Sequence, residues 1–170
     1  MLGRPKVPAA LRSRFDKDER LLALADGDAA VVAATNLGLW LPVEDAWRRV
    51  GWHEVVKATW TEAGLEVIEG VADAEGVVAD QSPVRYRLRE PRNLPVVVRQ
   101  RVERSIGRWE QVRVPGGTGR IVGRRAPGVN GVRWTARVDS GTPDTPEARS
   151  VLVDYLNRVK ALPTGETADF

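Results

Sequence analysis

The sequence predicts an α+β fold in two parts: an antiparallel β-barrel or sandwich capped by a helix, followed by a three-stranded antiparallel sheet and a C-terminal amphipathic helix. Three observations support this fold. Short apolar runs separated by Gly, Pro, Asn and Asp succeed one another over residues 20–89, which is typical of β structure. Apolar side chains recur at helical spacing in residues 94–106 and 145–162. Three further β candidates lie between these two helices.

Length and composition limit the classes of protein. The chain has 170 residues, 42% of them hydrophobic, which is enough for a sizeable core. It has no Cys, which excludes disulfides and thiolate chemistry and suits a reducing compartment. No run of about 18 apolar residues and no signal-peptide pattern is present. We therefore expect a cytoplasmic protein that does not span a membrane. The dominance of Arg over Lys, with abundant Ala, Val and Gly, is typical of a GC-rich bacterial genome.

The first part is expected to be built from short strands. After a charged arm, residues 1–18, the turn Asp26-Gly27-Asp28 separates two apolar runs and is a strong hairpin signal. Pro42 ends the third run, and Gly64 lies in a later turn. Residues 70–83 are small and acidic and predict a loop with a brief strand at 77–78. The strands are expected at 20–25, 30–35, 38–42, 47–50, 53–60, 65–69 and 84–89.

The second part is expected to begin at a helix over residues 94–106, with Asn93 as its N-cap and Pro95 in its first turn. Strands follow at 109–114, 120–125 and 132–138, separated by Gly- and Pro-rich turns at 115–119 and 126–131. Thr145 as N-cap and Pro146 at the first helical position then begin the C-terminal helix. We therefore divide the chain into an arm (1–18), a first half (19–107), a β-β-β-α half (108–162) that packs on the same helix, and a flexible tail (163–170).

The first half resembles a known family. Its order of strands and helix, with the segment 52–60, a tight turn at Gly64 and the apolar run 65–68, resembles bacterial pleckstrin-homology-like domains. The resemblance covers about residues 19–107 and implies two nearly orthogonal sheets plugged by a helix, used as a scaffold for protein or peptide contacts. Relatives that bind phosphoinositides carry a basic loop between the first two strands. Residues 26–28 are acidic here, so we expect no phosphoinositide binding.

Residues 94–162 follow the α-β-β-β-α order of double-stranded-RNA-binding domains. In that family the second helix begins with a lysine cluster that contacts phosphates. The corresponding helix begins Thr145-Pro146-Glu147-Ala148-Arg149 and lacks that cluster. The similarity is therefore one of topology only.

The net charge of +3 conceals a strong segregation along the chain. The formal net charge is −5 over residues 1–84, +11 over residues 85–137 and −3 over residues 138–170. A basic block between two acidic ones indicates an anionic partner or ion pairing within the chain.

Catalytic chemistry finds little support. His53 is the only histidine, so a histidine-based metal site is excluded by count, and its neighbours in a predicted strand favour a structural role. The Gly-rich segment 115–120 lacks the Gly-Lys-Ser/Thr ending of a phosphate-binding loop and precedes a strand. We expect neither an enzyme nor a cofactor.

The arginines are the strongest candidates for a binding site. Alternation along strands gives Arg85, Arg87 and Arg89 one shared face, and places Arg133 and Arg137 on another. Arg113, Arg120 and Arg124 join the latter if their strands form a meander. The result would be a sheet with one apolar and one cationic side.

Four explanations of the cationic side stay open: arginines on a solvated sheet, ion pairs with the acidic parts of the chain, a protein partner with an acidic patch, and nucleic acid. Aromatic residues are sparsely interleaved with the arginines, and no nucleic-acid motif is present. We therefore expect a non-catalytic cytoplasmic protein-interaction module with an unknown partner, and keep a nucleic-acid-contacting module as the alternative.

Overall fold

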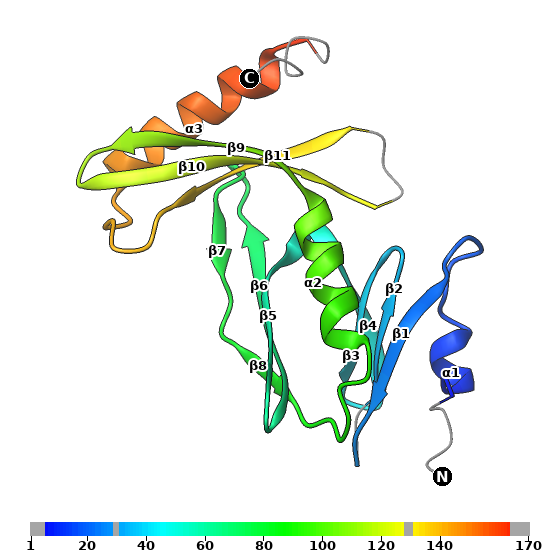
Figure 1. Ribbon diagram of the computed structural model, residues 1–170. Coiled ribbons are helices and arrows are strands. Elements are labelled where there is room, and N and C mark those ends of the chain that lie inside the picture. Colours follow the sequence, from blue (N-terminus) through cyan, green and yellow to red (C-terminus); the bar gives the residue numbers. More distant parts are fainter. Residues whose placement is uncertain (1–5, 29–30, 128–130, 164–170) are drawn as a thin grey trace.

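The computed structural model describes residues 6–28, 31–127 and 131–163. It has an α+β architecture with three antiparallel sheets and a C-terminal helix, which confirms that part of the predicted fold class. Two sheets and one long helix form the lower body in Figure 1, and the third sheet lies across its upper end beneath the C-terminal helix. The first five residues and most of the predicted tail lie outside the described residues.

The first sheet is a meander of four consecutive strands. Its strands are β1 (Leu21–Asp26), β2 (Val31–Thr35), β3 (Gly38–Val43) and β4 (Ala46–Gly51). Alternate side chains point to opposite faces of the sheet. The inner face contributes Val32, Ala34, Leu39 and Leu41 to the largest core cluster. The outer face, with Leu24, Ala33 and Trp40, is covered by the N-terminal arm and its short helix α1 (Ala9–Arg12).

The second sheet is organised around its longest strand. A 3-10 turn, η1 (Trp52–Glu54), leads from β4 into β5 (Val55–Thr61), which pairs with β6 (Gly64–Ala72). β6 also pairs with β7 (Val78–Asp80) and β8 (Val84–Tyr86). No ladder joins the first and second sheets among the residues that the structure describes, so the barrel alternative of our prediction is wrong: these sheets do not form a closed barrel.

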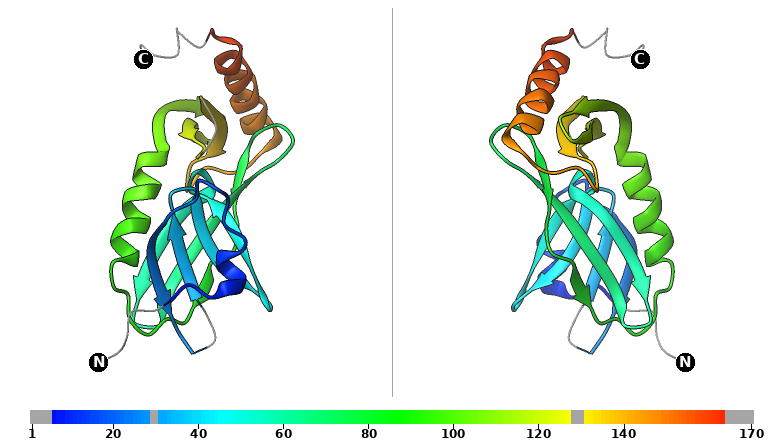
Figure 2. Two further views of the ribbon diagram at one scale, coloured as in Figure 1. Left: turned by 90° about the vertical axis from the view of Figure 1, so that its right-hand side faces the viewer. Right: turned by 90° about the vertical axis from the view of Figure 1, so that its left-hand side faces the viewer.

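The two sheets share one core with the helix α2 (Leu94–Ser105). Trp52 fills its upper part, 2% exposed, and donates its indole N–H to the carbonyl of Thr35, 3.0 Å away. Leu94 and Val98 extend from α2 into the same cluster. Figure 2 shows α2 running along the side of the two sheets and passing directly into the third sheet at its upper end. The absence of a linker at that point sets the direction of the third sheet.

The third sheet is the predicted meander, in the order β9 (Ile106–Val114), β10 (Gly117–Arg125) and β11 (Val132–Val138). Helix α3 (Pro146–Ala161) covers its apolar face, and Leu152 and Leu156 are fully buried there beside Ile121 and Ala136. Thr145 caps α3 as predicted, because its hydroxyl accepts the backbone N–H of Ala148 at 3.2 Å. The N–H of Ala136 also donates to the carbonyl of Gly76, which ties β11 to the β6–β7 connection.

Several local predictions are wrong for identifiable reasons. Residues 52–54 form a 3-10 turn because the side chain of Glu54 accepts the N–H of Gly51 and closes the turn. Part of the predicted loop 70–83 is strand, since β6 continues to Ala72 and β7 pairs with it. The predicted strand 84–89 pairs only as far as Tyr86. The expected turn 115–119 is shorter, because β10 already begins at Gly117.

The predicted cap of α2 also differs from the structure. Asn93 occupies the N-cap position, but its side chain makes no capping hydrogen bond. Its amide instead donates to the carbonyl of Leu22 in β1, 3.4 Å away. Asn93 therefore joins the start of the helix to the first sheet.

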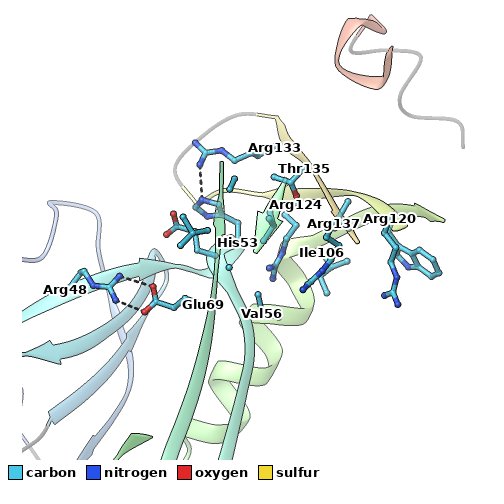
Figure 3. A pocket seen from close by; sticks show the side chains of 17 residues that line it. Arg48, His53, Val56, Glu69, Ile106, Arg120, Arg124, Arg133, Thr135 and Arg137 are labelled. Atoms are coloured by element: carbon cyan, nitrogen blue, oxygen red, sulfur yellow. Dashed lines mark hydrogen bonds and ion pairs between the residues drawn. The ribbon is translucent and has the colours of Figure 1, made fainter. Parts of the chain in front are cut away.

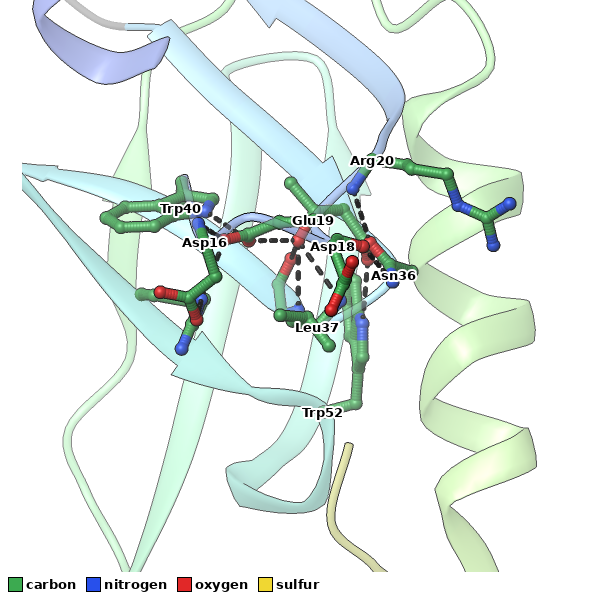
Figure 4. A network of polar contacts seen from close by, with 11 residues as sticks. Asp16, Asp18, Glu19, Arg20, Asn36, Leu37, Trp40 and Trp52 are labelled. Carbon is green, nitrogen blue, oxygen red and sulfur yellow. Dashed lines mark hydrogen bonds and ion pairs between the residues drawn. The ribbon is translucent and has the colours of Figure 1, made fainter. Parts of the chain in front are cut away.

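A buried carboxylate fastens the N-terminal arm to the first sheet (Figure 4). The Glu19 side chain is fully buried and accepts the hydroxyl of Thr35 at 2.5 Å and the indole N–H of Trp40 at 2.8 Å. Arg49 approaches the same carboxylate at 2.7 Å and also reaches Asp16. A buried charge is tolerated only when it is paired and hydrogen-bonded, and Glu19 meets both conditions.

We predict that Glu19→Ala lowers the free energy of unfolding by about 3 kcal/mol, because it leaves the Trp40 indole without its acceptor, removes the shorter hydrogen bond of Thr35 and leaves Arg49 without its buried partner. Asp18→Ala, on the same arm but exposed, serves as the control and is expected to change stability by less than about 0.5 kcal/mol. Urea unfolding of both variants measures the difference. Equal effects of the two substitutions would contradict this role of Glu19.

Candidate functional site

The register of the third sheet brings together the five arginines of the predicted cationic face. Arg124 lies directly opposite Arg133, and Arg120 lies opposite Arg137. Arg113 lies opposite Thr118, two residues from Arg120 along β10, and so belongs to the same side. The opposite side packs on α3. The predicted apolar side and the shared face of the five arginines are therefore present, but the arginine side also carries the apolar side chains of Ile106, Trp109 and Val122.

A cavity of about 600 Å³ lies between this cationic side and the upper end of the second sheet, and we call it the arginine cavity. Residues from β4, η1, β5, β6, β7 and all three strands of the third sheet line it. Figure 3 shows Arg120, Arg124 and Arg137 projecting from the third sheet towards the second. The lining residues are Arg48, His53, Glu54, Val56, Glu69, Gly70, Val71, Ala72, Val78, Ile106, Trp109, Arg120, Val122, Arg124, Arg133, Thr135 and Arg137.

The cavity differs from the predicted site in two ways. Arg113 shares the face but does not line the cavity. Arg48 and His53 line it although both come from the first half of the chain. Their participation depends on contacts across more than fifty residues, and the only sequence signal was that His53 is the one histidine of the chain.

The second candidate set has the predicted alternation but no part in the cavity. Arg85, Arg87 and Arg89 are exposed, whereas Tyr86 and Leu88 between them are buried. Arg85 pairs with Glu66 at 2.7 Å, and Arg89 pairs with Asp28 at 2.5 Å. Arg85 and Arg89 therefore form ion pairs with acidic residues of the same chain.

Three arginines of the cavity are also compensated by carboxylates. Arg137 pairs with Asp80 at 2.5 Å, and Arg120 pairs with Asp139 at 2.7 Å. Arg48 makes a two-point contact with Glu69, at 2.5 and 3.0 Å. The Arg120 and Thr118 side chains and the Gln111 amide hold the pKa of Asp139 below its usual range, although its burial acts in the opposite direction.

Arg124 is held by backbone carbonyls instead of a carboxylate. Its guanidinium donates to the carbonyls of Val55 and Trp52, at 3.0 and 3.2 Å, and twice to the hydroxyl of Ser105, at 2.6 and 3.2 Å. Burial, with the neighbouring charge of Arg137, lowers the pKa of Arg124 to about 10, so the group is cationic at neutral pH. It clamps the third sheet onto the first half of the chain and leaves its charge without a counter-ion among the described residues.

Arg133 also lacks a carboxylate partner within the described part of the chain. Its Nη1 lies 3.3 Å from Nε2 of His53. A guanidinium has only donors, so Nε2 is the acceptor and the imidazole is neutral, with its proton on Nδ1. Nδ1 is buried and has no hydrogen-bond partner there. The ring lies directly on Gly51, where an added Cβ would come within 2.7 Å of Nδ1.

The surroundings of His53 disfavour its protonation. Burial lowers the pKa of His53, and the charges of Arg133 and Arg124 act in the same direction, whereas Glu54 opposes them. These groups belong to β11, β10 and η1, the elements packed around the imidazole. The cavity therefore holds an unprotonated base at neutral pH.

The net charge of the cavity is small, and the charges are unevenly distributed over its wall. Counting the lining groups with Asp80 and Asp139, five arginines face four carboxylates, which is a net charge of +1. Like charges directly opposite each other in a sheet are destabilising. Each member of the pair Arg120–Arg137 forms an ion pair with an aspartate, whereas Arg124 and Arg133 form none among the described residues. Glu54, the fourth carboxylate, lines the cavity beside His53 and forms no ion pair with a described residue.

A second hollow of about 580 Å³ shares the Arg120–Arg137 pair with the arginine cavity and is lined on its other side by Asp80, Asp139 and Asp144. All three aspartates are paired, Asp144 with Arg149 at 3.4 Å. The uncompensated charge therefore lies at the Arg124–Arg133 end.

Apolar side chains complete the wall of the arginine cavity. Val71, Ile106 and Trp109 are 53%, 45% and 58% exposed. The guanidinium carbon of Arg120 lies 5.4 Å from the centre of the Trp109 ring. Exposed apolar surface beside convergent polar groups is typical of a binding site.

Metal binding and membrane spanning have no support in the described residues. No group of three or more His, Asp or Glu side chains in residues 6–28, 31–127 and 131–163 is arranged to hold a metal ion. Over the same residues, no helix is long and apolar enough to cross a membrane.

Comparison of the chain with protein-family models, curated proteins and solved structures gave no match. The resemblance of residues 19–107 to pleckstrin-homology-like domains therefore stays a prediction, as do the domain boundaries.

We predict that folding stability falls as the pH drops below about 6.5, the usual pKa of histidine in an unfolded chain, because the unfolded protein then binds a proton that His53 in the folded protein resists. The variant His53→Gln, whose side chain cannot be protonated, is expected to lose this pH-dependent part of the folding stability. Urea unfolding of both proteins at pH 7.5 and 5.5 measures it.

Nuclear magnetic resonance provides an independent check, since the chain has only one histidine. The titration midpoint of its ring protons is expected below the ordinary histidine value. A midpoint at or above that value, or identical pH dependence in both proteins, would show that the cavity does not resist the charge.

Proposed function

We propose that this protein is a non-catalytic cytoplasmic protein-interaction module, with a pleckstrin-homology-like scaffold over residues 19–107, and that it binds an acidic segment of a partner protein in the arginine cavity. The observation that carries this proposal is the cross-strand pair Arg124–Arg133, two like charges without a carboxylate partner among the described residues, at the wall of a concave site. An anion brought by a partner offsets their repulsion.

The size of the cavity supports recognition of a few side chains. Binding pockets for compact ligands range from about 300 to 1,000 Å³, and the arginine cavity lies within this range. Arg133 makes one contact with a neutral imidazole, so it can turn towards an anion without breaking an ion pair. Charge-assisted hydrogen bonds of this kind are about twice as strong as neutral ones.

The alternative, a nucleic-acid-contacting module, is less well supported. A strand or duplex needs a cationic track along its backbone, whereas Arg120 and Arg137 are already paired and Arg113 lies outside the cavity. Arg124 and Arg133, the two arginines of the cavity without a carboxylate partner among the described residues, neutralise at most two phosphates. We therefore treat nucleic acid as an outcome of the test.

Selection of random displayed peptides on the protein tests the proposal. We expect the enriched peptides to contain Asp or Glu, and Arg133→Glu to weaken their binding by about tenfold or more, the worth of one charge-assisted hydrogen bond. Arg113→Glu is the matched control, because Arg113 lies on the same sheet face but outside the cavity. Peptides without acidic residues, or equal effects of both reversals, would refute the proposed site.

A salt titration with a mixed DNA and RNA pool separates the alternative. With only Arg124 and Arg133 lacking a carboxylate partner among the described cavity residues, the slope of log K against log salt is expected to be no steeper than about −1.4 on single strands, so binding stays weak even at low salt. Tight binding with a much steeper slope, lost in Arg133→Glu, would replace the protein partner with nucleic acid.

A further inference from the structure

We infer, building on the proposed function, that the group anchored in the arginine cavity is an amphipathic anion: a carboxylate joined to an aromatic or branched apolar group about two residue spacings away. In a protein partner this is an Asp or Glu beside a large apolar side chain. The inference rests on the order of the side chains across the cationic face.

The cavity side of the third sheet consists of three adjacent rows across the strands. The uncompensated row contains Ile106, Arg124 and Arg133. The next row contains Trp109, Val122 and Thr135, and the third contains Gln111, Arg120 and Arg137. An apolar row therefore lies between two cationic rows, of which only the first lacks carboxylate partners among the described residues.

Spacing along the strands determines the distance between the carboxylate and the apolar group of the ligand. Successive side chains on one face lie two residues apart, about 7 Å in a β-strand. A ligand whose carboxylate lies between Arg124 and Arg133 therefore has its apolar part over Val122, two residues from Arg124 on β10, when the two are linked by a short aliphatic chain. Trp109 lies directly opposite Val122 on β9, one strand spacing of about 4.8 Å further across the sheet. A bare anion would leave these side chains exposed.

The apolar side chains themselves favour such a ligand. The described residues include nine exposed large hydrophobic side chains, and three of them, Val71, Ile106 and Trp109, meet in the wall of this one cavity. Val71 comes from β6 of the second sheet, whereas Ile106 and Trp109 come from β9 of the third. An apolar group bound in the cavity covers part of this exposed surface, and burial of apolar surface stabilises binding in proportion to its area.

Three small probes test the inference: 4-phenylbutyrate, butyrate without the ring, and the uncharged 4-phenylbutanol. Binding is followed through the ring protons of His53, the only histidine, which adjoins Arg133. We expect 4-phenylbutyrate to bind about tenfold more tightly than either of the others, because only it meets both rows.

Variants assign the effect to the two rows. Trp109→Ala is expected to remove most of the advantage of the ring, whereas Val96→Ala, which changes an exposed apolar side chain on α2 outside the cavity, leaves it intact. Arg133→Gln is expected to weaken both acids about tenfold, and Arg113→Gln neither. Trp109 and Arg133 are exposed, so both variants are expected to fold.

The possible outcomes separate this inference from the proposed function. Equal binding of butyrate and 4-phenylbutyrate, or undiminished binding of 4-phenylbutanol, overturns the amphipathic anchor and leaves the acidic partner intact. Failure of both acids to bind, together with failure to select acidic peptides, overturns both. Tighter binding of 4-phenylbutyrate that is lost in Trp109→Ala supports the inference.

Discussion

The guanidinium of Arg124 is the contact on which the arrangement of the molecule depends. It extends from β10 to the carbonyls of Trp52 and Val55 and to the hydroxyl of Ser105, which belong to η1, β5 and the end of α2. These groups lie where the chain turns at the upper end of the lower body. Arg124 supplies a hydrogen-bond donor to each of the two carbonyls. Because α2 passes directly into β9, the covalent connection and this polar clamp hold the third sheet across the second at one end. The Ala136–Gly76 backbone hydrogen bond and the Arg137–Asp80 ion pair join the same two sheets through β11.

The same clamp explains why positive charge collects at this position. Carbonyl dipoles satisfy the hydrogen bonds of Arg124 but do not cancel its charge, so the positive potential extends into the cavity. Arg133, opposite Arg124 across the strands, adds a second charge, and His53 contributes a neutral acceptor where a carboxylate would have neutralised the pair. Elsewhere on the same face the chain supplies its own aspartates. The molecule thus pairs one cross-strand arginine pair with its own aspartates and leaves the other without a carboxylate partner among the described residues.

Local patterns predicted much of this architecture from the sequence. Alternation placed the five arginines on one side of a meander, and the Thr145–Pro146 signal marked the start of α3. The cavity itself was not predictable from the same patterns, because its other wall comes from residues such as Arg48, His53 and Val71 that are distant in sequence. Alternation also cannot tell which arginines find a carboxylate. The pairing of Arg137 with Asp80, and its absence at Arg133 among the described residues, follows from tertiary register.

Amide hydrogen exchange in the wild type and in Arg124→Met tests the central claim most directly. Methionine keeps much of the apolar stem but removes every donor to Trp52, Val55 and Ser105. The account predicts that protection falls in β9–β11 and in the adjoining η1 and β5, while the amides of β2 and β3 in the first sheet keep their wild-type rates. Unchanged protection in the third sheet, or equal loss of protection in β2 and β3, would contradict the role of Arg124 as the clamp between the two parts of the chain.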